Sequence, residues 1–214
     1  MLKPPIFGKT VAADVRRTEF DVKNEQLLSA NKKLDLLFIG DSITQQWELR
    51  AYFDGFVVNR GIGGDTSEYL LRRFEADALQ LRPGKIVLLI GVNDLFTVNY
   101  DYWNRRAGCD RDETVGAVLR HIRAAADMAD NLVLCTLSPV TLMPPHDQML
   151  WDGMVAEVNE GIKAVCKDMR LPCADYHQGF RGGLRDLAAA FAADGIHPNA
   201  RGYAIMAETL KGVL

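Results

Sequence analysis

The sequence lacks the features that would place it in a membrane, in contact with nucleic acid, or outside the cell. No apolar run approaches the length of about 18 residues that marks a membrane-spanning helix, and residues 1–5 lack the apolar stretch of a signal peptide. A net charge of −3 excludes a broad basic surface. We therefore expect a cytoplasmic protein without a membrane or a nucleic acid as partner.

Cysteine and histidine are scarce, and neither is spaced for metal binding. The cysteines have no CxxC pair, so we expect free thiols rather than disulfides or zinc ligands. The histidines are scattered without metal-ligand spacing, and we expect no metal and no organic cofactor. These residues are Cys109, Cys135, Cys166 and Cys173, with His121, His146, His177 and His197.

Length and composition predict one α/β domain. The 214 residues are 48% hydrophobic and 25% charged, which is typical of a globular protein with a substantial core. Five apolar runs are continuous rather than alternating, which indicates strands covered on both faces. The intervening segments are long enough for helices, so we expect a five-stranded parallel sheet with helices on both sides. The runs are 34–39, 56–58, 86–90, 132–137 and 171–174, with helical patterns at 14–30, 66–80, 112–130, 148–169, 183–192 and 200–213. We expect residues 1–30 to be a lead-in and a helix packed on this domain.

Small and polar residues follow the first three predicted strands, at 40–42, 59–66 and 91–94. A fourth cluster, at 194–198, supplies an acid and an imidazole near the end of the chain. Ligands of open parallel sheets bind outside the carboxyl ends of the strands. We therefore expect the four clusters to converge on one polar site.

The clusters contain the parts of an acyl-transfer site. Ser42 needs a base to take its proton, and His197 is the side chain best suited to that task. Asp194 can orient the imidazole from the same turn, and Pro198 restricts the backbone of His197. The backbone N of Ser42, a glycine N of the second cluster and the amide of Asn93 are candidate oxyanion donors.

Each part also has a purely structural interpretation. Ser42 could cap a helix, and Asn93 could do the same after the third strand. His197 could be a helix-entry residue, and Asp194 a turn former. Gly61, Gly63 and Gly64 could form a tight turn. It is the occurrence of all four clusters together that favours catalysis.

The four clusters resemble the blocks of the serine esterases and lipases called SGNH or GDSL hydrolases. The resemblance covers residues 36 to about 203 and implies a flavodoxin-like three-layer α/β/α fold. It implies Ser42 as nucleophile, His197 as base and Asp194 as its orienting acid. It also implies an oxyanion hole of Ser42, Gly64 and Asn93. The first block reads Gly-Asp-Ser-Ile where the family has Gly-Asp-Ser-Leu, a difference that affects no catalytic role.

The second block, Gly-Ile-Gly-Gly-Asp-Thr, is most similar to the platelet-activating-factor acetylhydrolase catalytic subunits and to bacterial sugar acetylesterases. Two other classes do not fit. The first block lacks the final glycine of the Gly-x-Ser-x-Gly elbow of α/β-hydrolases, and no G-x-G-x-x-G follows the first strand.

Substrate recognition is the least determined part of the prediction. Trp47, Tyr102 and Trp103 could stack on a sugar, or could instead pack a loop or a homodimer contact. We also expect Asp41 and Asp65, which belong to the first and second clusters, among the substrate-binding residues. Two long connections, 96–110 and 140–149, favour functional loops.

The sequence thus predicts an esterase acting on a small acyl group, with acetyl as the favoured group and an acetylated carbohydrate as one candidate substrate. The alternatives are a lysophospholipase or thioesterase, an acetylhydrolase of the platelet-activating-factor type, and an inactive homologue that only binds a ligand.

Overall fold

Strands and helices alternate along most of the chain. The computed structural model describes residues 16–98, 100–101, 106–141, 145–183, 190–192 and 194–214. The strands are β1 (Leu36–Gly40), β2 (Val57–Gly61), β3 (Lys85–Leu89), β4 (Tyr100–Asp101), β5 (Arg106–Ala107), β6 (Leu132–Cys135) and β7 (Cys173–Ala174). The α-helices are α2 (Arg17–Ala30), α3 (Ser42–Gln45), α4 (Ser67–Asp77), α5 (Val92–Phe96), α6 (Arg111–Asp127), α7 (Pro145–Met169), α8 (Tyr176–Gly183) and α9 (Ala200–Lys211), and the 3₁₀ helices are η1 (Leu49–Ala51) and η2 (Leu79–Leu81).

The main sheet has five parallel strands in the order β2-β1-β3-β6-β7, which confirms the predicted fold class. Its three central strands are almost wholly buried, as their continuous apolar runs require. Gly40 of β1 is level with Gly61 of β2 and Leu89 of β3. The segments that follow these strands therefore begin at one edge of the sheet.

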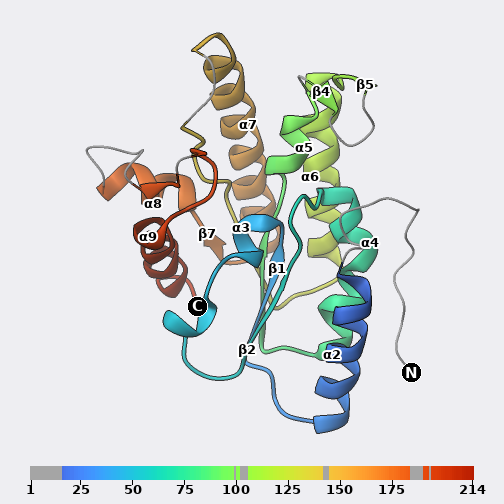
Figure 1. Cartoon of the computed structure of the whole chain (residues 1–214). Helices are drawn as coiled ribbons and strands as arrows, with labels where there is room; N and C mark the ends of the chain where they lie inside the picture. Colours follow the sequence, from blue (N-terminus) through green and yellow to red (C-terminus); the bar gives the residue numbers. More distant parts are fainter. Residues whose placement is uncertain (1–15, 99, 102–105, 142–144, 184–189, 193) are drawn as a thin grey trace.

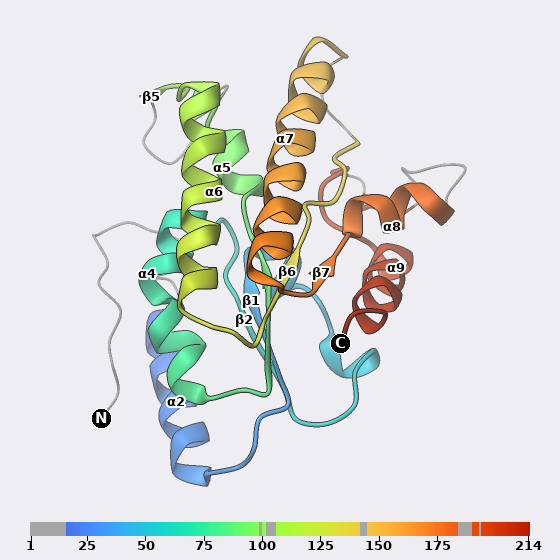
Figure 2. The same cartoon turned by 180° about the vertical axis from the view of Figure 1, so that it is seen from behind.

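Helices cover both faces of the sheet (Figures 1 and 2). Helices α4, α6 and α7 pack side by side over one face, with α2 beside α4. The other face carries α8 and α9, together with the short α3 and η1. Within this second layer, the hydroxyl of Tyr203 in α9 donates to the backbone O of Ile43 in α3 at 2.8 Å and so joins the two helices.

Two glycines allow α3 to lie directly on the sheet. A Cβ on Gly61 would collide with the backbone of Gln45, and a Cβ on Gly40 would collide with the backbone O of Leu89. The chain after β1 therefore passes within contact distance of the ends of β2 and β3. This close approach places Ser42 beside the second and third polar clusters.

The structure corrects part of the predicted secondary structure. Most of the helix expected at 183–192 lies outside the described residues; at the ends of that range, α8 (Tyr176–Gly183) finishes at Gly183 and Phe191 forms a β-bridge with Pro198. The long connection 96–110 contains the small antiparallel pair β4–β5, and α7 begins at Pro145, three residues before the predicted start. All four cysteines lie in the described part of the chain, and none of them forms a disulfide bond.

Candidate active site

Ser42 is the first residue of α3, just past the carboxyl end of β1. The capping role belongs to Asp41, whose carboxylate accepts a hydrogen bond from the backbone N of Ile43 at 2.9 Å. The interpretation of Ser42 as a helix cap is therefore wrong, and its Oγ lies 2.8 Å from Nε2 of His197 instead. As a first-turn residue, Ser42 also has a backbone N–H with no partner inside its own helix.

The imidazole of His197 lies between Ser42 and Asp194. Its Nδ1 is 2.7 Å from Oδ2 of Asp194, and its Nε2 is 2.8 Å from Oγ of Ser42. With a proton on Nδ1, His197 donates to the carboxylate, and Nε2 is free to accept the hydrogen of the hydroxyl. The fold thus joins two residues that are 155 positions apart in sequence into a Ser-His-Asp chain.

Asp194 is held in place by the turn that it begins. Its Oδ1 accepts hydrogen bonds from the backbone N of Ile196, at 2.9 Å, and of His197, at 3.0 Å. Partial desolvation raises the pKa of this carboxyl, but the N–H groups and the imidazole outweigh it and lower the pKa to about 2. Thr141 anchors the turn, because its backbone N and its Oγ1 both donate to O of Gly195, at 2.9 and 3.2 Å. The carboxylate therefore stays ionised near neutral pH.

The chain makes a tight turn just past β2. The backbone N of Asp65 donates to O of Ile62 at 3.1 Å, and Gly64 has a φ of 77°, which glycine adopts without steric cost. The N of Gly63 donates to Oε1 of Gln45 at 2.5 Å. By contrast, no described residue accepts a hydrogen bond from the N of Gly64. This difference makes Gly64, and not Gly63, the available donor of the turn.

Asn93 lies in the first turn of α5, at the carboxyl end of β3. Its Nδ2 donates to O of Asp65 at 2.9 Å, so the amide is anchored to the glycine turn. An amide nitrogen carries two hydrogens, which leaves the second for a ligand. Ser42, Gly64 and Asn93 therefore offer three N–H donors from three loops at one edge of the sheet.

The neighbouring Asp94 ties α5 to the start of α4. Its carboxylate accepts hydrogen bonds from the backbone N of Ser67, at 2.9 Å, and from its Oγ, at 2.6 Å. The Oγ of Ser67 is also 2.9 Å from Nδ1 of His121. Desolvation raises the pKa of Asp94 to about 6, against the effect of the bonds from Ser67. Sequence reasoning did not identify Ser67 or His121, because nothing local marks them as partners of this loop.

Sequence reasoning also missed Arg73. This fully buried residue of α4 forms ion pairs with Asp65, at 2.8 Å, and with Asp77, at 3.2 Å. A signal was present in the sequence, because Leu70, Arg73, Phe74 and Asp77 follow one another at the spacing of a single helix face. An arginine and an aspartate on the apolar face of a helix indicate a buried ion pair.

Three of the five expected substrate-binding residues are buried, which argues against their direct contact with a substrate. The side chains of Asp41 and Asp65 have no exposed surface, and Trp47 is only 4% exposed. Trp47 stacks on Tyr203, with ring centroids 5.4 Å apart, and meets Phe38 edge-on at 5.5 Å. Burial raises the pKa of Asp41 to about 7. With at most 4% of their surface exposed, these three residues offer a substrate almost no area to contact.

The other two expected substrate-binding residues, Tyr102 and Trp103, lie outside the described residues. Among the residues that are described, no helix is long and apolar enough to cross a membrane. No group of three or more His, Cys, Asp or Glu side chains in this part of the chain could hold a metal ion.

Comparison with known proteins assigns the family. Residues 38–205 match the GDSL-like Lipase/Acylhydrolase family. The chain belongs to this family. Membership of an acylhydrolase family places it among the carboxylic ester hydrolases, and the resemblance found in the four sequence blocks is confirmed.

The matches to individual relatives cover different fractions of the chain. An acetylxylan esterase from Geobacillus stearothermophilus is 25% identical over 200 residues, which are 80% of this chain and 90% of the esterase. The human platelet-activating factor acetylhydrolase IB subunit alpha2 is 39% identical over 70 residues, 30% of this chain and 31% of the subunit. The structure of a GDSL-like lipase from Bacteroides thetaiotaomicron superposes with a TM-score of 0.69 at 24% identity, covering 91% of this chain and 95% of the lipase.

Proposed function

We propose that this protein hydrolyses small acyl esters through a covalent intermediate on Ser42, and that its substrate is an acetylated carbohydrate. The observation that carries the mechanism is the chain of contacts from Ser42 through His197 to Asp194, at 2.8 and 2.7 Å. Such a chain activates a hydroxyl that is otherwise a weak nucleophile.

In the first half of the proposed reaction, Oγ of Ser42 attacks the carbonyl carbon while its proton passes to Nε2 of His197. The carbonyl oxygen becomes an oxyanion, which accepts hydrogen bonds from N of Ser42, N of Gly64 and Nδ2 of Asn93. Asp194 stabilises the imidazolium that has formed. When the carbonyl re-forms, the bond to the alcohol oxygen breaks, and His197 gives its proton to the departing alcohol.

In the second half, a water molecule takes the place of the alcohol. His197 removes a proton from this water as it attacks the acyl carbon of the ester with Ser42. The same three donors receive the second oxyanion. Collapse of the intermediate breaks the bond to Oγ, which recovers its proton from His197, and releases the carboxylic acid.

The preference for an acetyl group and a carbohydrate rests on the comparisons. Both named relatives are described as acting on acetyl esters. The acetylxylan esterase matches most of this chain, whereas the acetylhydrolase subunit matches 30% of it. The breadth of the first match favours a sugar over a phospholipid as the alcohol. The cytoplasmic location expected from the sequence stays a prediction.

The mechanism is tested with p-nitrophenyl acetate and the Ser42→Ala variant. We expect the wild-type protein to release nitrophenolate and to react covalently with a fluorophosphonate probe, and Ser42→Ala to do neither. Turnover by Ser42→Ala at the wild-type rate would refute the mechanism. A folded wild-type protein that neither turns over nor takes the label would instead be the inactive, ligand-binding homologue.

The substrate class is tested by acetate release from acetylated xylo-oligosaccharides, acetylated sialic acid and an acetylated phospholipid. Acyl-CoA and p-nitrophenyl esters of increasing chain length complete the panel. We expect the highest kcat/KM with an acetylated sugar and with the shortest acyl chain. Preference for the phospholipid, or for long acyl chains and thioesters, would replace the carbohydrate proposal while leaving the role of Ser42 unchanged.

A further inference from the structure

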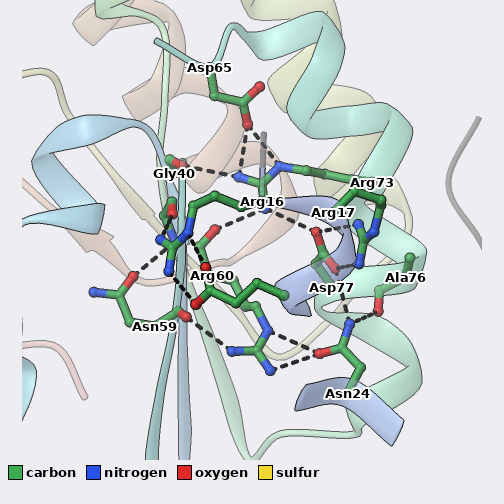
Figure 3. Close-up of polar contacts among 12 residues, drawn as sticks. Arg16, Arg17, Asn24, Gly40, Asn59, Arg60, Asp65, Arg73, Ala76 and Asp77 are labelled. Carbon is green, nitrogen blue, oxygen red and sulfur yellow. Dashed lines mark hydrogen bonds and ion pairs between the residues drawn. The ribbon is translucent and has the colours of Figure 1, made fainter. Parts of the chain in front are cut away.

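One buried side chain, that of Arg73, contacts two of the loops that carry proposed oxyanion donors, at Gly40 and at Asp65 (Figure 3). The side chain of Arg73 has no exposed surface. It donates to one residue just before Ser42 and to one just after Gly64 in the sequence. Nη2 donates to O of Gly40, two residues before Ser42, at 3.0 Å. Nε donates at 2.8 Å to the carboxylate of Asp65, the residue directly after Gly64.

The third donor loop is connected through the second. Asn93 has its amide bonded to the backbone O of Asp65, the residue whose carboxylate Arg73 holds. Arg73 also donates from Nη1 to O of Arg60, near the end of β2, at 2.8 Å. A displacement of Arg73 would therefore move the supports of all three donors together.

The contacts engage every nitrogen of the guanidinium. It donates four hydrogen bonds, one each to Asp65, Gly40, Arg60 and Asp77, and its Nη2 also forms an ion pair with the same Oδ2 of Asp65 at 2.8 Å. A lysine ammonium has three N–H groups and no planar fork, so it cannot make these contacts at once. The requirement at this position is for the geometry of arginine and not only for a positive charge.

Two residues of α2 hydrogen-bond to Arg60 and Asp77, the neighbours of Arg73. Asp77 lies between Arg73 and Arg17, and its Oδ1 and Oδ2 accept from Arg17 at 2.7 and 3.0 Å. Asn24 donates to Asp77 at 3.1 Å and accepts from Arg60 at 2.7 and 3.0 Å. In Figure 3, Arg17 and Asn24 lie on the side of Asp77 that faces away from Gly40. Arg17 shares the charge cluster but contacts none of the donor loops.

We propose that Arg73 is a positioning residue that sets the geometry of the oxyanion hole, an inference that rests on the proposed esterase function. It touches no reacting atom and acts through Gly40, Asp65 and, by way of Asp65, Asn93. Donors that shift by about 1 Å lose much of their effect on the rate, on the order of 100-fold. The loss falls on kcat, because the oxyanion forms only in the transition state.

The first test compares Arg73→Lys with Arg17→Lys, two substitutions that keep the charge and replace one arginine of the same cluster. We expect Arg73→Lys to lower kcat on p-nitrophenyl acetate by about 30- to 100-fold with KM within a factor of three. We expect Arg17→Lys to lower the melting temperature while leaving kcat within a factor of three. Equal losses of kcat in the two variants would overturn the proposal.

A second test separates positioning from general destabilisation. If Arg73 acts through the hole, its replacement matters less once the hole is already damaged, because residues that act as a unit are not additive. We expect Arg73→Lys in an Asn93→Ala background to lower kcat at least threefold less than it does alone. Independent, multiplying effects would overturn the proposal. In both tests the wild-type protein is assayed first. If it shows no esterase turnover, the proposed function itself is refuted, independently of any variant.

Discussion

The substitution Asn93→Ala removes one proposed oxyanion donor and little else. The side chain is half-buried, and its one hydrogen bond within the described structure runs from Nδ2 to O of Asp65 at 2.9 Å. The backbone of residue 93 stays in the first turn of α5, since alanine is a good helix former. The catalytic effect and the structural effect of the change can therefore be assessed separately.

The two effects differ in size. Loss of one oxyanion donor lowers kcat by about 10²- to 10³-fold, or about 2.7–4 kcal/mol of transition-state stabilisation. Loss of one side-chain bond to a backbone carbonyl lowers the free energy of unfolding by only about 0.5–1.5 kcal/mol. For a chain of this length, that amounts to a melting temperature lower by a few degrees, about 1–6 °C. The variant should thus be folded at 25 °C and nearly inactive.

The assay is steady-state release of nitrophenolate from p-nitrophenyl acetate, beside thermal unfolding followed by circular dichroism. Asn131→Ala is a matched control. Asn131 is also half-buried, and its Nδ2 also donates to a backbone carbonyl, O of Pro83, at 2.8 Å. Pro83 and Asn131 precede β3 and β6, so this bond lies at the opposite edge of the sheet from the site. We expect the control to lose a similar amount of stability and to keep its kcat within a factor of three. An Asn93→Ala variant with a kcat within a factor of three of the wild type would refute the donor role. A kcat loss in Asn131→Ala equal to that in Asn93→Ala would show that the assay reports stability.

Two further substitutions test the buried groups beneath the site. Burial raises the pKa of Asp41 to about 7 from an ordinary value near 4, so the folded state keeps a proton that the unfolded state loses, and stability falls as the pH rises between these values. We expect Asp41→Asn to show a smaller drop in melting temperature between pH 4.5 and 7.5 than the wild type, with a residual drop from Asp94; identical drops would contradict the assignment. Trp47→Ala should cost about 3–5 kcal/mol of stability, and the milder Trp47→Phe should lower the melting temperature while KM for an acetylated xylo-oligosaccharide stays unchanged. A raised KM at unchanged melting temperature would restore the substrate-binding interpretation of Trp47.

The strands were predictable because of where they lie. A parallel strand covered on both faces needs apolar side chains on both, and this leaves continuous runs in the sequence. The second strand is the instructive exception, since it continues past the apolar run to Gly61. Its polar residues have distant partners, because Asn59 donates to O of Thr44 at 2.7 Å and Arg60 donates to Oδ1 of Asn24. No pattern in the sequence around Asn59 and Arg60 predicts that Thr44 and Asn24 are their partners.

Helix α8 was not predicted, and the cause is the same. The segment of α8 contains three glycines in eight residues, a composition that disfavours helix. It is helical nonetheless, because Tyr176 and Phe180 are fully buried and the backbone of Gly179 lies against Thr209 of α9. Tertiary packing overrides local propensity at this point.

The sequence by itself predicted which residues would carry the chemistry and the strand ends at which they lie. Glycine, serine, asparagine and histidine have distinct chemical uses, and apolar runs locate the strands that precede three of the four clusters. Only the tertiary structure decided that Ser42 meets His197, that Gln45 occupies the N–H of Gly63, and which polar side chains are buried. The physical reason is that periodicity reports the surroundings of one helix or strand. Contacts across 155 residues, and an arginine buried among three loops, depend on how the strands are ordered in the sheet.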